Sequence, residues 1–145
     1  MKAKLLGILF FVALFAFGAS AQSEFDGRSL AGIKSDFKAV GAVARVKIKA
    51  VKFAAEDIHP LYAAESEVVE IFKGTVKKSK ILTFYFHAEE DYDVQKLIGK
   101  DCIVFLEKES AIPAGGKGWY ELENSMISTS PKLIAQLRKM KNSAK

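Results

Sequence analysis

Two long strand-like segments limit the fold of this chain more than any other feature, because their alternation of apolar and charged residues shifts phase. In the first segment Val46 and Ile48 alternate with charged residues, and the phase changes at Ala50 and Val51. In the second segment, Tyr62–Phe72, apolar positions are doubled. A phase shift within a strand indicates a β-bulge, and bulges allow a sheet to curl. The pattern therefore favours a strongly curved sheet.

The rest of the chain predicts three more strands and two helices. The further strands are expected at Ile81–Phe86, Cys102–Leu106 and Trp119–Ile127. Glu89–Ile98 begins with acidic residues and is followed by a glycine, which predicts one or two helical turns. Ser130 and Pro131 predict the start of a C-terminal helix. The expected fold is mainly β: a small five-stranded OB-like barrel with a short helix between strands 3 and 4 and a C-terminal helix.

The first residues of the chain predict export. Two lysines precede an apolar stretch, Leu5–Gly18, which is shorter than the roughly 20 residues of a spanning helix. The small residues Ala19 and Ala21 follow, as at a signal-peptidase site. We therefore expect a signal peptide over 1–21 and a mature protein that begins at Gln22. This protein would be periplasmic or secreted, without stable membrane insertion; an uncleaved N-terminal anchor is the alternative.

The mature chain has the length of one domain. Residues 22–36 are polar and glycine-containing, with a short helical turn expected around Ser29–Lys34, and are predicted to form a leader. The barrel domain is expected over 37–145, with its C-terminal helix from about 130. The single cysteine of the chain, Cys102, lies in a run that is apolar on both faces. We expect it to be buried in a central strand; an interchain disulfide or a reactive thiol is the alternative.

Two segments resemble a known superfamily. The run Ala64–Gly74, which ends in a Phe-Lys-Gly sequence, is followed by a loop and the strand Ile81–Phe84. Further along, Leu97–Lys100 leads into Ile103–Leu106. Together these runs resemble strands of the tissue-inhibitor-of-metalloproteinase and netrin-module superfamily, including its bacterial single-domain relatives, over about residues 37–128. The resemblance implies an OB-like barrel.

The resemblance does not extend to metalloproteinase inhibition. The animal inhibitors of this superfamily bind the protease zinc through an N-terminal cysteine, whereas this mature chain is expected to begin at Gln22.

The sequence motifs that could indicate catalysis or metal binding are weak. His87 and the acidic residues at 89–91 could bind a cation, but they fit an acidic helix start better. Glu65 and Glu67 alternate as on an exposed strand face. We therefore expect no enzyme activity and no cofactor.

Basic residues give the most useful functional indication. The candidate binding residues lie on the first strand and around the hairpin between the second and third strands: Lys47, Lys49, Lys73, Lys77, Lys78 and Lys80, with Lys52 beside them. OB-type surfaces bind single-stranded polyanions by combining such lysines with stacking aromatic residues. The aromatic residues nearest in sequence are Phe84, Tyr85 and Phe86.

The overall charge of the chain argues against a dedicated nucleic-acid binder. The net charge of +5 falls to +3 once Lys2 and Lys4 are removed with the signal, which is not the strong excess of a dedicated nucleic-acid binder. We expect an exported, non-catalytic binding or interaction module whose partner is an exported protein or an envelope polymer. The alternative is a weak polyanion binder, for envelope polysaccharide or nucleic acid, that uses the lysine-rich hairpin. A merely solubilising face is the simplest interpretation of the lysines.

Overall fold

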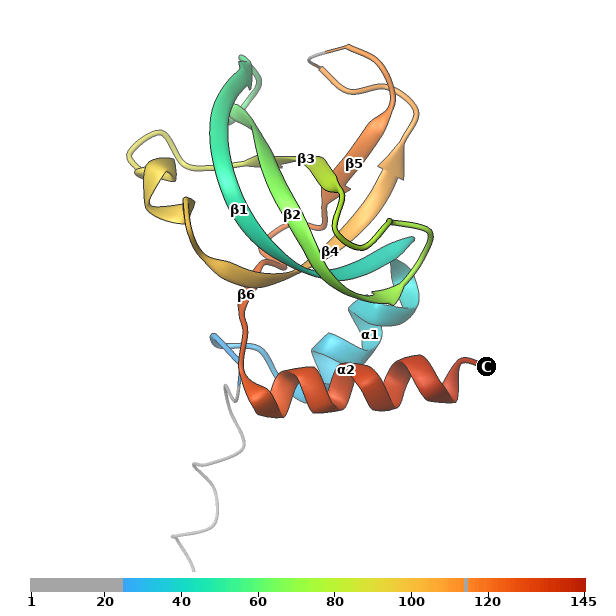
Figure 1. Ribbon diagram of the computed structural model, residues 1–145. Coiled ribbons are helices and arrows are strands. Elements are labelled where there is room, and N and C mark those ends of the chain that lie inside the picture. Colours follow the sequence, from blue (N-terminus) through green and yellow to red (C-terminus); the bar gives the residue numbers. More distant parts are fainter. Residues whose placement is uncertain (1–24, 114) are drawn as a thin grey trace, which may run out of the picture.

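The computed structural model describes residues 25–113 and 115–145 (Figure 1). The predicted signal peptide and the predicted mature start at Gln22 lie outside the described residues. Within them the fold is mainly β, with six strands in one mixed sheet and two α-helices. No helix in these two ranges combines the length and the apolar character needed to cross a membrane.

The series of paired strands in the sheet begins and ends at the first strand. The strands are β1 (Ala42–Ala55), β2 (Leu61–Lys73), β3 (Ile81–His87), β4 (Asp101–Glu109), β5 (Gly118–Glu121) and β6 (Ile127–Ser128). β1 pairs with β2, β2 with β3, β3 with β5, β5 with β4, and β4 again with β1. The β3–β5 pairing is parallel and the other four are antiparallel, while β6 adds to β4.

The predicted bulges are present where β1 and β2 pair. The phase shift predicted at Ala50 and Val51 coincides with a register shift between Ile48 and Ala50. Two further shifts pass over Val69 and Phe72, which belong to the doubled apolar positions of the second segment. Each bulge bends the paired strands, and Figure 1 shows β1 and β2 as long, curved strands.

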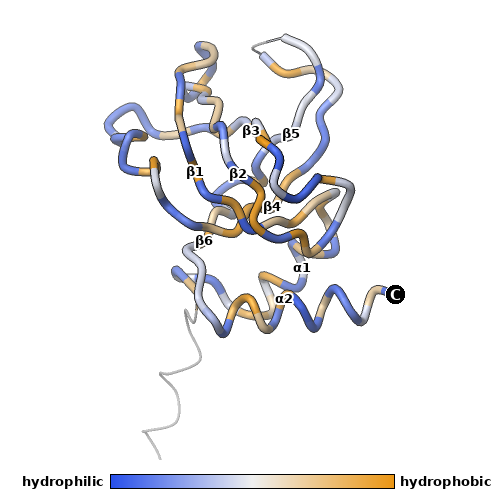
Figure 2. Tube along the Cα trace, in the orientation of Figure 1, coloured by the Kyte–Doolittle hydropathy of each residue, from blue (hydrophilic) through white to orange (hydrophobic). Residues whose placement is uncertain are grey.

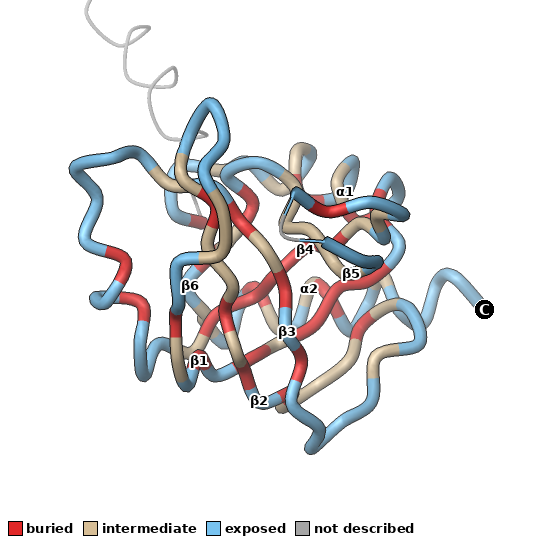
Figure 3. The backbone as a smooth tube through the Cα atoms, turned by 90° about the horizontal axis from the view of Figure 1, so that it is seen from above, coloured by how far each residue is buried: buried red, intermediate tan, exposed pale blue. Residues whose placement is uncertain are grey.

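The hydrophobic core has two parts that share β4. The larger cluster joins the strands to one another, and the smaller cluster joins the sheet to the helices α1 (Leu30–Ala39) and α2 (Pro131–Ser143). β4 contributes Val104 and Leu106 to the larger cluster and Ile103 and Phe105 to the smaller one. This explains its continuous apolar sequence. Hydrophobic residues gather where β1, β2 and β4 approach one another (Figure 2), and buried positions follow the strands while the loops are exposed (Figure 3).

The helix α1 differs from the sequence expectation. The sequence predicts a short turn around Ser29–Lys34 within a leader and the barrel domain from residue 37, but residues 30–39 form a ten-residue helix. Ser29 begins it by accepting a hydrogen bond from the Gly32 amide (3.1 Å). Ile33 and Phe37, one helical turn apart, are buried in the smaller cluster. Residues 30–39 therefore pack against the sheet.

The segment between β3 and β4 contains a helical turn, but this turn begins later than the acidic residues suggest. The one or two helical turns expected within Glu89–Ile98 are represented by a single four-residue 3₁₀ helix, η1 (Val94–Leu97), near the end of that segment. Asp93 begins it by accepting a hydrogen bond from the Gln95 amide, so the acidic residues at 89–91 are not its cap. Val94 and Leu97 pack into the larger core cluster.

The predicted fifth strand is interrupted. Trp119–Ile127 was expected to be one strand, but β5 ends at Glu121 and β6 begins at Ile127. The carboxylate of Glu121 accepts hydrogen bonds from the Ser125 and Met126 amides, both at 2.9 Å, and thereby closes the turn between the two strands. Burial raises the pKa of this carboxyl group, and the two amide hydrogen bonds lower it in part.

Two bidentate ion pairs fasten the elements together. Arg45 on β1 binds both carboxylate oxygens of Asp101 on β4, with an Nη2–Oδ2 distance of 2.6 Å, and this contact lowers the pKa of Asp101. Arg138 on α2 binds both oxygens of Glu70 on β2 in the same way.

The helix α2 begins at Pro131 after Ser130, as the sequence predicts.

Cys102 should react slowly with a thiol reagent in the native protein. Its side chain lies in the larger core cluster with 4% of its surface exposed, and burial raises the pKa of the thiol to about 12. Because the thiolate is the reactive form, Ellman's reagent at neutral pH should label Cys102 only after guanidinium is added. Complete labelling within minutes of the native protein would contradict the burial of β4.

Candidate binding site at the lysine hairpin

The loop 74–80 between β2 and β3, which we call the lysine hairpin, is held at both ends. Gly74 has φ +89°, and a Cβ atom there would lie 2.5 Å from the carbonyl oxygen of Gly41. The loop can therefore approach β1 this closely only with glycine. At the other end the Ser79 amide donates to the Val68 carbonyl (2.8 Å), and the Val68 amide donates to the Lys80 carbonyl (3.1 Å). The loop is thus folded back on β2.

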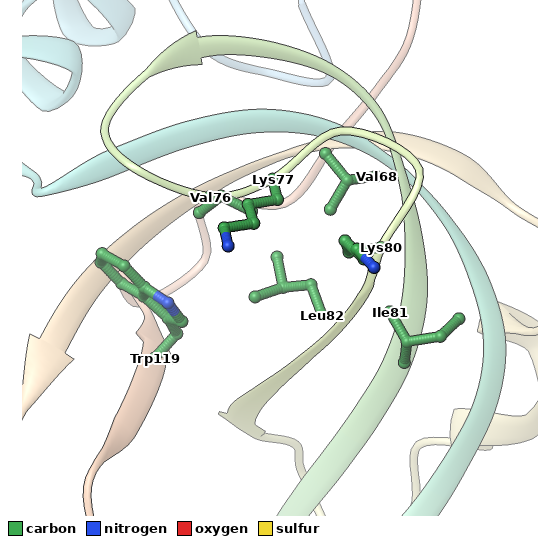
Figure 4. A pocket seen from close by; sticks show the side chains of 7 residues that line it. All are labelled: Val68, Val76, Lys77, Lys80, Ile81, Leu82 and Trp119. Atoms are coloured by element: carbon green, nitrogen blue, oxygen red, sulfur yellow. The ribbon is translucent and has the colours of Figure 1, made fainter.

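A hollow of about 220 Å³ lies between the lysine hairpin, the start of β3 and the side chain of Trp119 on β5 (Figure 4). Its lining consists of Val68, Val76, Lys77, Lys80, Ile81, Leu82 and Trp119. Val68 and Leu82 are almost fully buried and form an apolar floor. None of the lining residues is acidic. The hollow therefore combines an apolar interior with a positively charged rim.

The indole of Trp119 has a defined place beside this hollow. Trp119 pairs with Phe84 on β3 and with Lys108 on β4. The ammonium group of Lys108 lies 5.8 Å from the ring centroid, within the range of a cation–π contact. A Cβ atom at Gly41 would lie 3.4 Å from the ring, so the indole packs closely over this glycine. The ring is partly exposed and lines the hollow.

Three lysines of the hairpin carry charge that their surroundings do not neutralise. Lys77, Lys78 and Lys80 are all exposed. Their ammonium groups make no ion pair or hydrogen bond with any residue in the described part of the chain. Two of the three, Lys77 and Lys80, line the hollow. The hairpin is thus a small region of uncompensated positive charge.

The predicted binding residues of the first strand have a different environment. Lys49 forms an ion pair with Glu67 (3.0 Å), and the neighbouring Lys52 forms one with Glu65 (2.9 Å). Lys47 lies opposite Glu67 on β2 and opposite Asp101 on β4. Glu65 and Glu67 thus face lysines of the first strand, and the charges of the two strands offset each other.

Lys73, another predicted binding residue, contacts the end of α1. Its ammonium group donates hydrogen bonds to the carbonyl oxygens of Phe37 (2.7 Å) and Lys38 (3.0 Å), and it lies 5.7 Å from the Phe37 ring centroid. Carbonyls in the last turn of a helix have no partners within the helix, and a cation near them is favourable. The structure therefore gives Lys73 a role in holding α1 against the sheet.

The predicted aromatic partners of the lysines are mostly turned away from the surface. Phe84 and Phe86 point into the larger core cluster, so the expectation that they stack with a ligand is wrong. Strand alternation leaves only Tyr85 on the outer face, where its ring centroid lies 6.4 Å from that of Tyr120. The aromatic residue that does accompany the lysines is Trp119, which is distant in sequence.

A second polar cluster joins the β1–β2 loop to β3 and β5. His87 Nε2 lies 3.0 Å from Asp57 Oδ2, and the hydroxyl of Tyr120 lies 3.4 Å from the same nitrogen. The amide of Ile58 and then His87 lower the pKa of Asp57, whereas partial burial and the charge of Asp57 raise the pKa of Tyr120. All three side chains are partly exposed.

This cluster replaces the predicted association of His87 with the acidic residues at 89–91. Of those three residues, Glu89 lies near the other histidine, with 3.7 Å between Glu89 Oε2 and His59 Nδ1. Among the described residues no three histidine, cysteine, aspartate or glutamate side chains converge as metal ligands. The cluster's clearest role is to hold the β1–β2 loop in position.

Compared with known proteins, the chain matches no protein-family model, and no curated protein is significantly similar to it in sequence. The resemblance to the netrin-module superfamily therefore stays a prediction.

Proposed function

We propose that the mature chain is an exported, non-catalytic binding module of the netrin-module type, built on an OB-like barrel, with its binding site at the lysine hairpin. The returning order of strand pairings and the parallel contact between β3 and β5 support the barrel. The position of η1 between β3 and β4, with Val94 and Leu97 packed against the strands, also supports it. The expected compartment is the periplasm or the extracellular space.

The contrast among the lysines carries the proposal. The strand-one lysines face glutamates and Lys73 caps a helix, whereas Lys77 and Lys80 remain uncompensated beside an apolar hollow. A solubilising surface does not require an apolar recess, whereas ligand sites are typically concave, apolar and furnished with a few convergent polar groups. The partner would be an exported protein or an envelope polymer with negative charge.

Site-specific photo-crosslinking in the producing cell tests this proposal. A photoreactive residue at position 78, at the tip of the lysine hairpin, should yield a defined adduct, and Lys77→Glu/Lys80→Glu should abolish it. The same residue at position 139, on the exposed face of α2, serves as the control. Adducts that are equal from both positions, or unchanged by the charge reversal, would count against the lysine hairpin as the binding site.

The second candidate is a polyanion binder, favoured by the three neighbouring lysines without ion pairs. Because each neutralised phosphate of a single strand contributes a salt slope of about −0.7, three lysines allow a slope of about −2. We expect weak heparin and oligonucleotide binding that disappears near physiological salt.

A salt titration measures this, with Lys77→Glu/Lys78→Glu as the test variant. The matched control is Lys34→Glu/Lys139→Glu, which reverses two exposed charges on the helices. Tight binding at physiological salt that only the hairpin variant abolishes would place the polyanion function above the protein-binding one.

A further inference from the structure

We propose, on the basis of the binding function above, that the hollow binds a small organic anion with one aromatic ring or short branched alkyl chain. The apolar part would lie on the floor formed by Val68 and Leu82, against Trp119. The carboxylate or sulfonate would lie between the ammonium groups of Lys77 and Lys80.

The size of the hollow limits its occupant. At about 220 Å³ it is smaller than the roughly 300–1,000 Å³ of pockets for drug-sized ligands. One ring or one branched chain fits this volume, whereas several consecutive bases or sugars do not. Trp119 is also the only tryptophan of the chain, so the hollow offers a single indole surface rather than a series of stacking positions.

The chemistry of the lining separates an amphipathic acid from a sugar or a nucleotide. The floor presents aliphatic carbon, Trp119 presents its indole ring with the ring N–H toward the hollow, and the ammonium groups of Lys77 and Lys80 lie at the rim. Burying a hydroxyl group or a base edge against such a floor costs free energy, because its hydrogen bonds with water are lost. An anion at the rim keeps its partners, since ammonium groups form charge-assisted hydrogen bonds with carboxylates.

The hollow is formed before any ligand binds. Gly74 fixes one end of the lysine hairpin against β1, and the Val68 pairings fix the other end. Ile81, at the rim, exposes 65% of its surface next to the two lysines. A ligand that covers Ile81 and Trp119 would remove apolar surface from water without reorganising the loop.

Binding of 3-phenylpropionate to the nitrogen-15-labelled protein tests the inference by NMR, because the single tryptophan gives one indole N–H signal. We expect this signal and the amides of residues 76–82 to shift, with a Kd on the order of 1 mM. The neutral 3-phenylpropanamide should bind about fivefold more weakly, since it lacks the ion pairs with the lysines. The cation 3-phenylpropylamine should not shift the indole signal.

Lysine and isoleucine variants test whether the residues at the rim of the hollow recognise the ligand. Lys77→Met/Lys80→Met keeps the apolar stems and should remove the difference between acid and amide, whereas Lys34→Met/Lys139→Met should preserve it. Ile81→Ser should weaken both ligands. Equal binding of acid and amide to the wild type, shifts centred elsewhere, or no shift at all would each overturn the inference. Heparin binding that depends on Lys77 and Lys78 without any response to 3-phenylpropionate would overturn it too, yet leave the polyanion function standing.

Discussion

Replacing Gly74 with alanine should destabilise the protein by about 3 kcal/mol, because the new side chain meets two separate obstacles. At φ +89° an L-residue is strained, and its Cβ atom would lie 2.5 Å from the Gly41 carbonyl oxygen and 2.9 Å from the Ala42 Cβ atom. The two contacting atoms belong to the backbone and to a short side chain, neither of which can turn aside. The contacts are therefore relieved only if the lysine hairpin moves away from β1. Urea denaturation measures the loss.

Gly99 is the matched control for this substitution. It has φ +86°, but a Cβ atom there meets nothing within 4 Å. Gly99→Ala should therefore cost only the conformational strain, about 1 kcal/mol. If both substitutions destabilise the protein equally, the close approach of the lysine hairpin to Gly41 is not a feature of the folded protein.

Leu137→Ala should lower the free energy of unfolding by about 2–5 kcal/mol. Leu137 is fully buried in the smaller core cluster, where α2 packs with α1 and the outer face of β4. Its truncation leaves a cavity whose walls belong to helices and strands together, so the whole domain should unfold at a lower temperature in a single transition.

Lys139→Ala, on the exposed face of the same helix, is the control and should change stability by less than about 0.5 kcal/mol. A loss of less than about 1 kcal/mol for Leu137→Ala would mean that α2 is only loosely attached. A separate early transition in the variant would mean that α2 and the sheet unfold independently, contrary to the shared core.

Much of the strand architecture could be predicted because local patterns carry it. Alternation and apolar runs located β1 to β4, the phase shift and the doubled apolar positions located register shifts, and Ser130 with Pro131 located the start of α2. The helix α1 was underestimated, because Ile33 and Phe37 reveal an apolar face only once the sheet that covers them is known. The interruption between β5 and β6 depends on the Glu121 carboxylate, which accepts hydrogen bonds from the Ser125 and Met126 amides. Strand propensity alone does not predict this side-chain contact.

The candidate site could be predicted only in part, because charge compensation depends on strand register. The sequence indicated that lysines matter, but not that Lys49 and Lys52 lie next to glutamates on β2. A register shift of one residue would have changed these partners. Trp119 lies next to the lysine hairpin only because β5 pairs with β3, a contact between segments far apart in the chain. Nothing local to Trp119 indicates that neighbourhood.

The central claim is that a positively charged rim surrounds a hollow lined by Trp119. Fluorescence quenching of this single tryptophan by iodide, caesium and neutral acrylamide tests the claim most directly, with N-acetyltryptophanamide as the reference for each quencher. Lys77, Lys80 and Lys108 lie around the indole, so iodide should quench Trp119 more efficiently than caesium relative to this reference. Lys77→Glu/Lys80→Glu should reverse that order without changing the effect of acrylamide. Equal relative quenching by the two ions in the wild-type protein, or an order that the charge reversal leaves unchanged, would contradict the account.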